Sequence, residues 1–401
     1  MEVCPETEVF VIGGGPAGLA AAIAAKQAGF DVVVADAATP GHDKACGEGM
    51  MPDGIAAARS LGIDLMGLEA YPIAGIRFHS AGASVTADFP DGMGLGIRRT
   101  TLHAAFARHA ERVGVHLLWG AHVTGISAGA VEVSGRVVKT RFIVGADGIH
   151  SRVRAWAHLE ATRNDRQRIG FRRHFAVAPW SRYLEMHWAN RGQLYITPVN
   201  EREVGVALLT RDRGTRLEQA LEWFPEVQRR LTGAAPASSE RGGVTRSRTL
   251  KAVARGRIAL VGDASGSVDA ITGQGICLAM QQSIALADAI AADDLRMYQK
   301  AHVRLMRRPQ FMSSLMLLLD GRPRLQQMAI AAMKAWPQCF EALLAYHVGA
   351  FALTSARRGE PRSVTWPAKS ALLSNALPPC IPHLQPAAPI ATAQYPPETP
   401  D

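Results

Sequence analysis

Short apolar runs and helical patterns alternate along the first part of the chain. Residues 8–12 and 31–35 predict strands, and the segment 17–28 between them predicts a helix. This helix is rich in alanine on all sides, as expected of a helix that lies buried against a sheet. The pattern therefore predicts a strand, a glycine turn, a helix and a second strand, in that order.

Alternating patterns typical of strands occur between residues 71 and 89 and again from about 166 to 250. One helix, over residues 217–231, interrupts the second of these regions, and an amphipathic helix is predicted over residues 97–114. A strand near residue 260 leads through a glycine-rich loop into a long helix, and residues 300–350 are helical in pattern. No internal repeat is present.

Composition and charge narrow the class of protein. Hydrophobic residues make up 48% of the 401 positions and charged residues 20%, which is typical of a globular protein with an ample core. The net charge of +9 comes from scattered basic residues, so the sequence favours a cationic soluble enzyme over a nucleic-acid-binding protein. Attraction to an anionic membrane surface or an acidic substrate is the alternative.

Cysteine usage and the N-terminus bear on the compartment. The five cysteines form no CxxC pair, so we expect reduced thiols, no metal site and a cytoplasmic protein. The acidic N-terminus lacks the apolar core of a signal peptide, and no run approaches 18 consecutive apolar residues. A peripheral contact with a membrane surface stays open.

The first motif is Gly13-x-Gly15-x-x-Gly18, between the first predicted strand and helix. Gly13 permits the tight turn, Gly15 lets backbone amides approach a pyrophosphate, and Gly18 lets the helix lie close to the strand. Asp36 ends the second strand, where a carboxylate accepts hydrogen bonds from ribose hydroxyls. Together these residues predict a dinucleotide site, without separating FAD from NAD.

Two further stretches end apolar strands with an aspartate. The first ends in Asp147-Gly148, and the second ends in Gly262-Asp263 and runs through a glycine-rich loop into a helix. In this order and spacing, the three stretches resemble the FAD-binding signatures of the para-hydroxybenzoate-hydroxylase-like flavoproteins. That superfamily includes aromatic monooxygenases and geranylgeranyl reductases.

The resemblance implies a role in binding FAD for several residues. Asp36 would hold the adenosine ribose, Asp263 would accept a hydrogen bond from a ribityl hydroxyl, and Asp147-Gly148 would lie near the pyrophosphate. The loop residues Gly273, Gly275 and Ile276 would present amides to the N1/O2 edge of the flavin. Arg99, or else Arg98, would meet the phosphates, unless these arginines merely cap a solvated helix.

The same resemblance implies the fold and its domains. We expect an α/β protein with a Rossmann-like FAD-binding domain of the GR2 type, made of residues 1–75, 95–165 and 251–300. An interleaved antiparallel-sheet domain for the substrate would comprise residues 76–94 and 166–250. C-terminal helices would occupy residues 301–358, followed by a tail over 359–401 that holds about ten of the 23 prolines and is expected to be irregular.

The loop from Lys44 to Gly49 bears on the branch of the superfamily. Lys44, also assigned to the cofactor site, and the following Cys46-Gly47-x-Gly49 resemble geranylgeranyl reductases. In the lipid-pocket element of that branch, Tyr195 and Pro198 are retained here but its tryptophan and phenylalanine are not. This departure favours the hydroxylases.

Candidate catalytic and pocket residues are few. Cys46 is a candidate proton donor beside the flavin, or a small buried apolar residue. Glu48 is a candidate general acid or base, or else a solvent-facing carboxylate. His187, together with His174 and Trp188, lies on strands expected to wall the substrate pocket, or is structural.

The sequence therefore predicts an oxidoreductase that binds FAD and takes electrons from NAD(P)H. We expect it to hydroxylate a small hydrophobic substrate of aromatic, polyketide-like or lipid-like character. Reduction of carbon–carbon double bonds in an isoprenoid or lipid is the alternative, and a flavin-bound accessory protein acting on a protein partner is an alternative of another class. The helices after Arg308 either pack on the flavin domain or form a greasy entrance. Substrate identity, nicotinamide preference and oligomeric state are not determined by the sequence.

Overall fold

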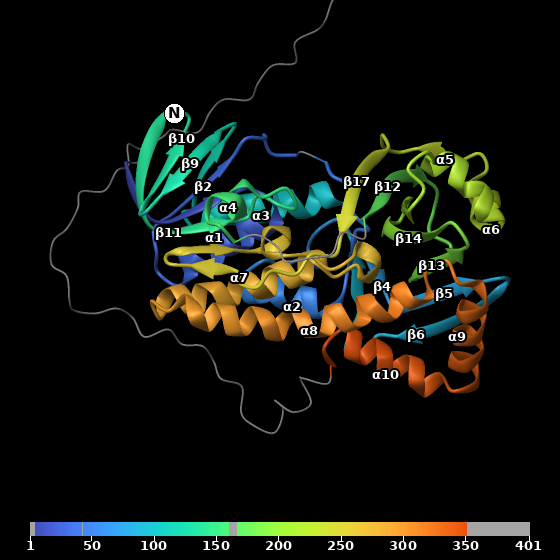
Figure 1. Ribbon diagram of the computed structural model, residues 1–401. Coiled ribbons are helices and arrows are strands. Elements are labelled where there is room, and N and C mark those ends of the chain that lie inside the picture. The colour runs from blue at the N-terminus through green and yellow to red at the C-terminus, as the bar shows by residue number, and fades with distance from the viewer. Residues whose placement is uncertain (1–4, 42, 160–166, 351–401) are drawn as a thin grey trace, which may run out of the picture. The chain divides into compact units, whose positions relative to one another are not determined.

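A computed structural model describes residues 5–41, 43–159 and 167–350. The expected C-terminal tail lies outside the described residues. The described residues belong to one compact unit. Within it, the two large sheets lie at opposite ends, and a layer of helices runs along both (Figure 1). The fold is mixed α/β, as predicted.

The first sheet is mainly parallel. Its central path runs β18-β19-β11-β1-β2-β8, and the hairpin β9–β10 adds to β11. Its strands are β1 (Glu6–Ile12), β2 (Val32–Asp36), β8 (His116–Trp119), β9 (Val123–Ser127), β10 (Ala130–Val133), β11 (Arg136–Gly145), β18 (Ala254–Arg255) and β19 (Ile258–Leu260). Because β1, β2, β11 and β19 are parallel, their carboxyl ends meet at one edge. The three sequence motifs follow three of these strands and are therefore brought together.

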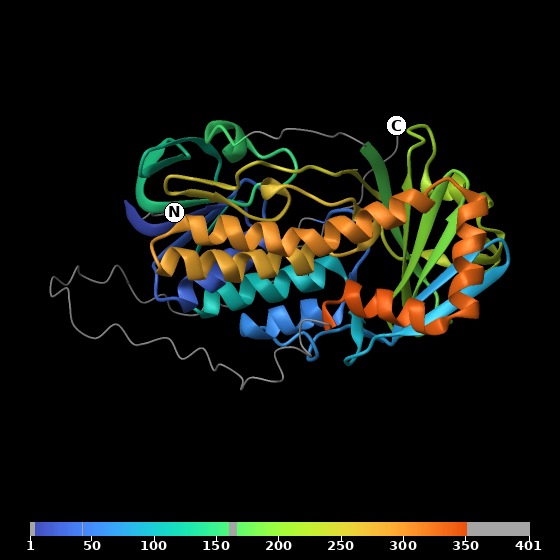
Figure 2. The ribbon, with the colours of Figure 1, turned by 60° about the horizontal axis from the view of Figure 1, so that its bottom comes forward.

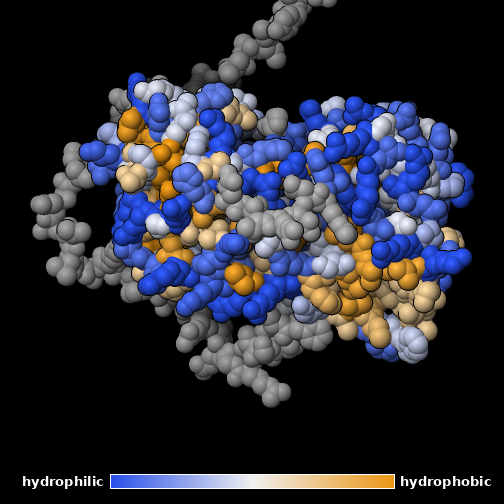
Figure 3. Space-filling view, viewed as in Figure 1, coloured by the Kyte–Doolittle hydropathy of each residue, from blue (hydrophilic) through white to orange (hydrophobic). Residues whose placement is uncertain are grey.

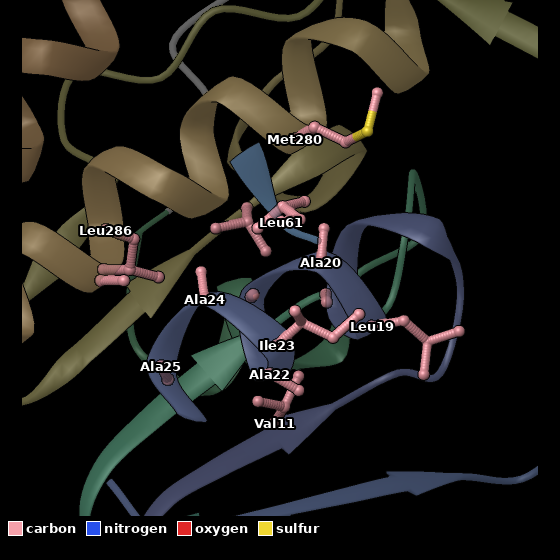
Figure 4. Packing of buried hydrophobic residues seen from close by; sticks show 14 of the residues in the cluster. Val11, Leu19, Ala20, Ala22, Ile23, Ala24, Ala25, Leu61, Met280 and Leu286 are labelled. Atoms are coloured by element: carbon pink, nitrogen blue, oxygen red, sulfur yellow. The ribbon is translucent and has the colours of Figure 1, made fainter. Parts of the chain in front are cut away.

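Helices cover one face of this sheet. α1 (Pro16–Gln27) is almost fully buried between the sheet and α7 (Gly275–Ala291), and Figure 4 shows Ala20 and Ala24 of α1 beside Met280 and Leu286 of α7. Alanine on all sides of α1 permits this close contact on both flanks. The remaining helices of this half are α2 (Pro52–Ser60), α3 (Arg99–Arg112) and α4 (Arg152–Trp156).

The second sheet is mainly antiparallel. Its order is β16-β12-β15-β14-β13-β5-β6, with β17 also paired to β12. Its strands are β5 (Gly75–Ser80), β6 (Ala83–Asp88), β12 (Gln167–Ala176), β13 (Tyr183–Ala189), β14 (Gly192–Asn200), β15 (Glu203–Thr210), β16 (Ala235–Pro236) and β17 (Arg241–Arg246). A small sheet of β3 (Gly49–Met50), β7 (Gly94–Gly96) and β4 (Tyr71–Ile73) lies between the two.

The helix predicted over residues 217–231 needs a correction. The structure divides it into α5 (Leu217–Ala220), the 3-10 turn η1 (Leu221–Trp223) and α6 (Pro225–Leu231). Pro225 has no amide hydrogen and disfavours a helical conformation at Phe224, so a new helix starts at the proline. These elements pack on one face of the second sheet through the core that includes Leu217, Phe224 and Val227.

Three C-terminal helices join the two halves. α8 (Leu295–Leu319) lies alongside α7 and continues to the second sheet, where α9 (Pro323–Ala335) and α10 (Pro337–His347) cover β5 and β6 (Figures 1 and 2). Phe340 and Leu344 of α10 pack with Phe78 of β5 in one buried cluster. Two 3-10 turns, η2 (Gly262–Ser265) and η3 (Ala270–Thr272), lead into α7. The helical pattern predicted for residues 300–350 is present as this layer.

Candidate cofactor and substrate site

A cavity of about 910 Å³ runs from the carboxyl edge of the first sheet to α8, α9 and α10. Its lining combines residues of the three sequence motifs with apolar side chains of the second sheet. The predicted site residues that line it are Gly13, Gly15, Asp36, Lys44, Cys46, Glu48, Arg99, Asp147, Gly148, Tyr195, Gly262, Asp263, Gly273, Gly275 and Ile276. The fold therefore gathers residues that lie as far apart in the sequence as Gly13 and Ile276.

The glycine loop after β1 forms one end of the cavity. A Cβ atom at Gly13, where φ is +110°, would lie 2.5 Å from the carbonyl oxygen of Ala146. A Cβ at Gly18 would lie 1.8 Å from the oxygen of Gly13, so Gly18 permits the helix contact and does not itself line the cavity. Gly15 differs, because a Cβ there would meet nothing within 4 Å. The open backbone at Gly15, at the N-terminus of α1, fits a phosphate group.

The Asp36 carboxylate shapes the same loop. Its Oδ2 accepts a hydrogen bond from the amide of Gly14 at 2.6 Å, and its Oδ1 accepts one from the amide of Ala38 at 2.8 Å. A ring nitrogen of His103 lies 2.8 Å from the carbonyl oxygen of Gly14. Asp36 thus fixes the glycine loop as well as facing the cavity.

Asp263 faces the cavity beside two positive charges. Its carboxylate accepts no hydrogen bond from the residues that the structure describes. Removal from bulk water raises the pKa of this carboxyl, and the charges of Arg99 and Lys44 oppose the shift. A carboxylate in this position is an acceptor that a bound hydroxyl group would satisfy. Arg98, the second candidate for phosphate, instead pairs with Glu203 at 2.6 Å.

Two further segments lie at the cofactor end of the cavity, the loop after β11 and the start of α7. Oδ2 of Asp147 accepts hydrogen bonds from the amides of Arg152 and Val153, so this residue caps α4. At the start of α7, Gly275 faces open space, as Gly15 does at the start of α1. Two helix N-termini therefore point at one cavity, and each supplies partial positive charge for an anionic group.

The start of α7 is also tied to the far end of the cavity. Nε2 of Gln274 donates a hydrogen bond of 2.5 Å to the carbonyl oxygen of His347, the last residue of α10. Both side chains are buried. The segment that precedes α7 and the helix that closes the apolar end are thus in direct contact.

Cys46 and Glu48 lie where the two halves of the cavity meet. Burial raises the pKa of the Cys46 thiol, with Arg99 lowering it and Glu48 raising it, so the thiol is protonated at neutral pH. Glu48 is buried with a positive φ of 59°. Its Oε1 accepts the amide of Arg99 at 2.8 Å, and its Oε2 lies 2.5 Å from Nε2 of His174. The alternative of a solvent-facing carboxylate is wrong.

Two partners of Glu48 lie on β12: His174, which the sequence places on an expected pocket wall, and Arg172, which the sequence does not indicate. Arg168, Arg172 and His174 are spaced four and two residues apart on this strand, so their side chains share one face, and all three are buried. Arg172 pairs with Asp43, and Arg168 pairs with Asp269 of the loop before α7. A strand with charged residues on one face and phenylalanines on the other was the available signal. It indicates a polar face that packs against the cavity loops.

The other end of the cavity is apolar. Phe78 and Trp188 stack with ring centroids 4.9 Å apart, and Phe340 of α10 lies 5.4 Å from Phe78. Met312 and Met316 of α8 line the same region. Trp188, which the sequence places on an expected pocket wall, lines the cavity together with residues of α8 and α10 that the sequence does not single out.

Of the other residues predicted for the pocket, Tyr195 lines the cavity, whereas Pro198 and His187 do not. Tyr195 lines the cavity and donates a hydrogen bond of 2.9 Å to the carbonyl oxygen of Ile271, and burial raises its pKa. Pro198 lies outside the lining, with its carbonyl close to Gly96 of β7. His187 also lies outside it, because alternate residues of a strand face opposite sides and its neighbours Met186 and Trp188 take the cavity side.

His187 belongs instead to a cluster on the opposite face of the sheet. Its ring stacks on that of His79 at 4.1 Å, and its Nε2 lies 3.2 Å from Oε2 of Glu185. These three side chains are of metal-ligating types, and Arg77 supplies a positive charge 3.4 Å from Glu185. The expectation of no metal site stays a prediction.

Comparison with known proteins places this geometry in context. A family model described as an FAD binding domain matches residues 6–296. The menaquinone reductase of Mycobacterium tuberculosis is 28% identical to the chain over 74% of this chain and 79% of its own length.

Two solved structures share the fold. A geranylgeranyl bacteriochlorophyll reductase-like protein from Thermoplasma acidophilum superposes with a TM-score of 0.68 at 21% identity, covering 79% of this chain and 89% of the other. A p-nitrophenol 4-monooxygenase from Pseudomonas putida superposes with a TM-score of 0.72 at 17% identity, covering 87% and 98%. The family match over residues 6–296 confirms the resemblance inferred from the motifs, and both solved structures share the fold of the chain.

Proposed function

The chain belongs to the FAD binding domain family and is an FAD-dependent oxidoreductase, and we propose that it reduces carbon–carbon double bonds in a long apolar, isoprenoid-like substrate. The observation that carries this proposal is the apolar end of the cavity. It joins the flavin-binding end directly and is walled by aromatic and methionine side chains of β5, β13, α8 and α10.

The chain's own residues fit FAD. The bare backbone at Gly15 leaves room for the pyrophosphate, and Asp263 offers a carboxylate that accepts no hydrogen bond from the described residues. We assign the adenosine ribose to Asp36, the phosphates to Arg99, and the flavin edge to the amides at Gly273, Gly275 and Ile276. FAD, when bound, supplies the pair of electrons for the reduction.

The apolar end would hold the hydrocarbon. Each methylene group that leaves water contributes about 0.8 kcal/mol, so a chain of isoprene units gains most of its affinity from this surface. Phe78, Trp188 and Phe340 offer flat faces to double bonds and methyl branches. Because the hydroxyl of Tyr195 donates its hydrogen bond to Ile271, the ring is the part of this side chain that would contact the substrate.

Cys46 would supply a proton. Saturation of a double bond adds two electrons and two protons, so a protonated group is required at the boundary between the flavin and the substrate. The raised pKa keeps the Cys46 thiol protonated there at neutral pH. Glu48 would hold the Cys46 loop in place, because its carboxylate joins the loop to α3 and to β12.

We take NAD(P)H as the electron donor. The sequence contains no second GxGxxG motif after a strand, so the nicotinamide would reach the flavin from solution and not from a domain of its own.

The test is an assay of the purified, FAD-loaded protein with NAD(P)H and a polyprenyl lipid under anaerobic conditions. Double-bond reduction yields a product heavier by two hydrogen atoms without oxygen. A product that forms in air alone and is heavier by one oxygen atom would reject the proposal and establish hydroxylation.

Hydroxylation is the second candidate. It is supported by the loss of the tryptophan and phenylalanine of the lipid-pocket element near Tyr195.

A further inference from the structure

The outer surface of α8 carries basic side chains in its first half and large apolar ones in its second. Lys300, Arg304 and Arg307 are exposed one turn apart. The same face continues to Phe311 and Leu318, whose exposed fractions are 53% and 50%. One side of a single helix thus changes from cationic to apolar along its length.

The hairpin of α9 and α10 extends the apolar part. Met328 and Trp336 are 65% and 62% exposed, and Tyr346 packs edge-on against Phe311. Figure 3 shows apolar side chains gathered where α8, α9 and α10 lie in Figure 1. Among the described residues, eleven large apolar side chains are exposed; five of them lie on the second half of α8 and on the α9–α10 hairpin, and two more lie on the first half of α8.

The charge of this region is mainly positive. From Leu295 to His347 the chain has eight arginines and lysines against two acidic residues, Asp320 and Glu341. Asp320 is itself paired with Arg211. Much of the +9 charge of the whole chain therefore lies in these helices, beside the apolar patch.

The cavity reaches the surface at the same hairpin. Trp336, Cys339 and Ala332 line the cavity and are also exposed. A substrate that enters here would pass between the helices that carry the patch. Within the described part of the chain, no helix is long and apolar enough to cross a bilayer.

We propose that the outer face of α8 and the α9–α10 hairpin dock on the surface of an anionic lipid bilayer and admit the apolar substrate directly from it. The exposed apolar residues enter the region between headgroups and acyl chains, while Lys300, Arg304 and Arg307 meet lipid phosphates. Trp336 suits the interface, since its ring is apolar and its N–H is polar. This inference rests on the proposed function for its substrate, but the docking itself does not need turnover.

The experiment is flotation of the full FAD-loaded chain with vesicles of phosphatidylcholine, alone or mixed with phosphatidylglycerol. We expect binding to the mixed vesicles that weakens with salt, and little binding to phosphatidylcholine alone. The triple variant Lys300→Glu, Arg304→Glu, Arg307→Glu should bind at least about tenfold more weakly. The variant Leu318→Gln, Met328→Gln should also bind more weakly, and neither residue lines the cavity.

The matched control is Arg136→Glu, Lys139→Glu, Arg229→Glu, which reverses one lysine and two arginines at exposed positions of β11 and α6 and so changes the net charge by the same amount. It should bind as the unaltered chain does. Equal loss in this control would show that net charge alone is responsible and would overturn the proposal. So would a failure to float, or a chain that buries the patch by self-association in sedimentation velocity.

A second readout separates this inference from the proposed function. Polyprenyl lipid is offered once in detergent micelles and once in the anionic vesicles. Docking predicts that the triple variant keeps its turnover in micelles and loses it in vesicles. Turnover in both forms without flotation would reject docking alone, and flotation without double-bond reduction would reject the proposed function alone.

Discussion

Oε2 of Glu48 lies 2.5 Å from Nε2 of His174, and this contact joins a loop of the first half to a strand of the second. The other carboxylate oxygen accepts the amide of Arg99, and Nδ1 of His174 lies 2.8 Å from the hydroxyl of Ser238. One side chain therefore connects the Cys46 loop, α3 and β12. Its buried position makes it a structural anchor of the site.

Glu48→Ala should lower the free energy of unfolding by about 3–5 kcal/mol, because it leaves buried charged partners unmatched. Glu48→Gln keeps the shape and should cost about 1.5–3 kcal/mol, since the charge-assisted bonds weaken. Urea denaturation of the apoprotein measures both. Glu111→Gln, at an exposed site of α3, is the control and should change stability by less than about 0.5 kcal/mol. Equal stability of all three variants would refute the anchor.

Gly15→Val should yield a folded protein without a yellow chromophore. A side chain there meets nothing in the protein within 4 Å, so it occupies the space expected for the pyrophosphate. Gly18→Val is the contrast, since its Cβ would collide with Gly13 and the fold itself should suffer. Absorbance spectra and circular dichroism distinguish the two. A yellow Gly15→Val protein would contradict the assignment.

Asp263→Asn should weaken FAD binding at least about tenfold, because a charge-assisted hydrogen bond is worth about 1.5–3 kcal/mol. The same change should affect the stability of the apoprotein in the other direction. Burial raises the pKa of Asp263, so the unfolded chain ionises before the folded one as pH rises. Stability is then lost between the ordinary and the raised pKa, and Asn removes that loss.

Calorimetry of the apoprotein at acid and neutral pH checks this sign. The Asn variant should match the unaltered chain at low pH and exceed it at neutral pH. A variant that is less stable at neutral pH would show that Asp263 has a stabilising partner.

Cys46→Ala should leave FAD bound and slow double-bond reduction at least about 100-fold, the lower end of the usual range for loss of a positioned acid. In the unaltered chain, burial raises the pKa of this thiol, so its alkylation by iodoacetamide should accelerate only at strongly alkaline pH. Peptide-resolved mass spectrometry follows Cys46, with the exposed Cys339 as an internal reference. Fast alkylation of Cys46 near neutral pH would argue against a protonated donor.

The cofactor end of the fold could be predicted because its signals are local. Gly13, Gly15 and Gly18 report on a turn that two neighbouring elements enclose, and Asp263 follows its strand directly. Parallel strands bring their carboxyl ends to one edge, so local motifs were sufficient to predict their convergence. The apolar strands and α1 could be predicted for the same reason, because their patterns are local in the sequence.

The substrate end could not be predicted so fully, because its contacts span the chain. Glu48 and His174 are 126 residues apart, and nothing near either residue indicates the other. The placement of His187 depended on which face of its strand points toward the cavity. Because side chains alternate between the two faces, a shift of one position moves a residue from the cavity to the opposite face of the sheet. Phe340 required knowledge of where α10 packs, which tertiary contacts decide.

The hydrogen bond from Gln274 to His347 links the cofactor end of the cavity to its apolar end. A bound cofactor that orders the turn before α7 would therefore also help to order the last turn of α10, beside the entrance. If FAD orders the turn before α7, then by thermodynamic linkage a ligand that orders α10 would raise the affinity for FAD by the same factor by which FAD raises the affinity for that ligand.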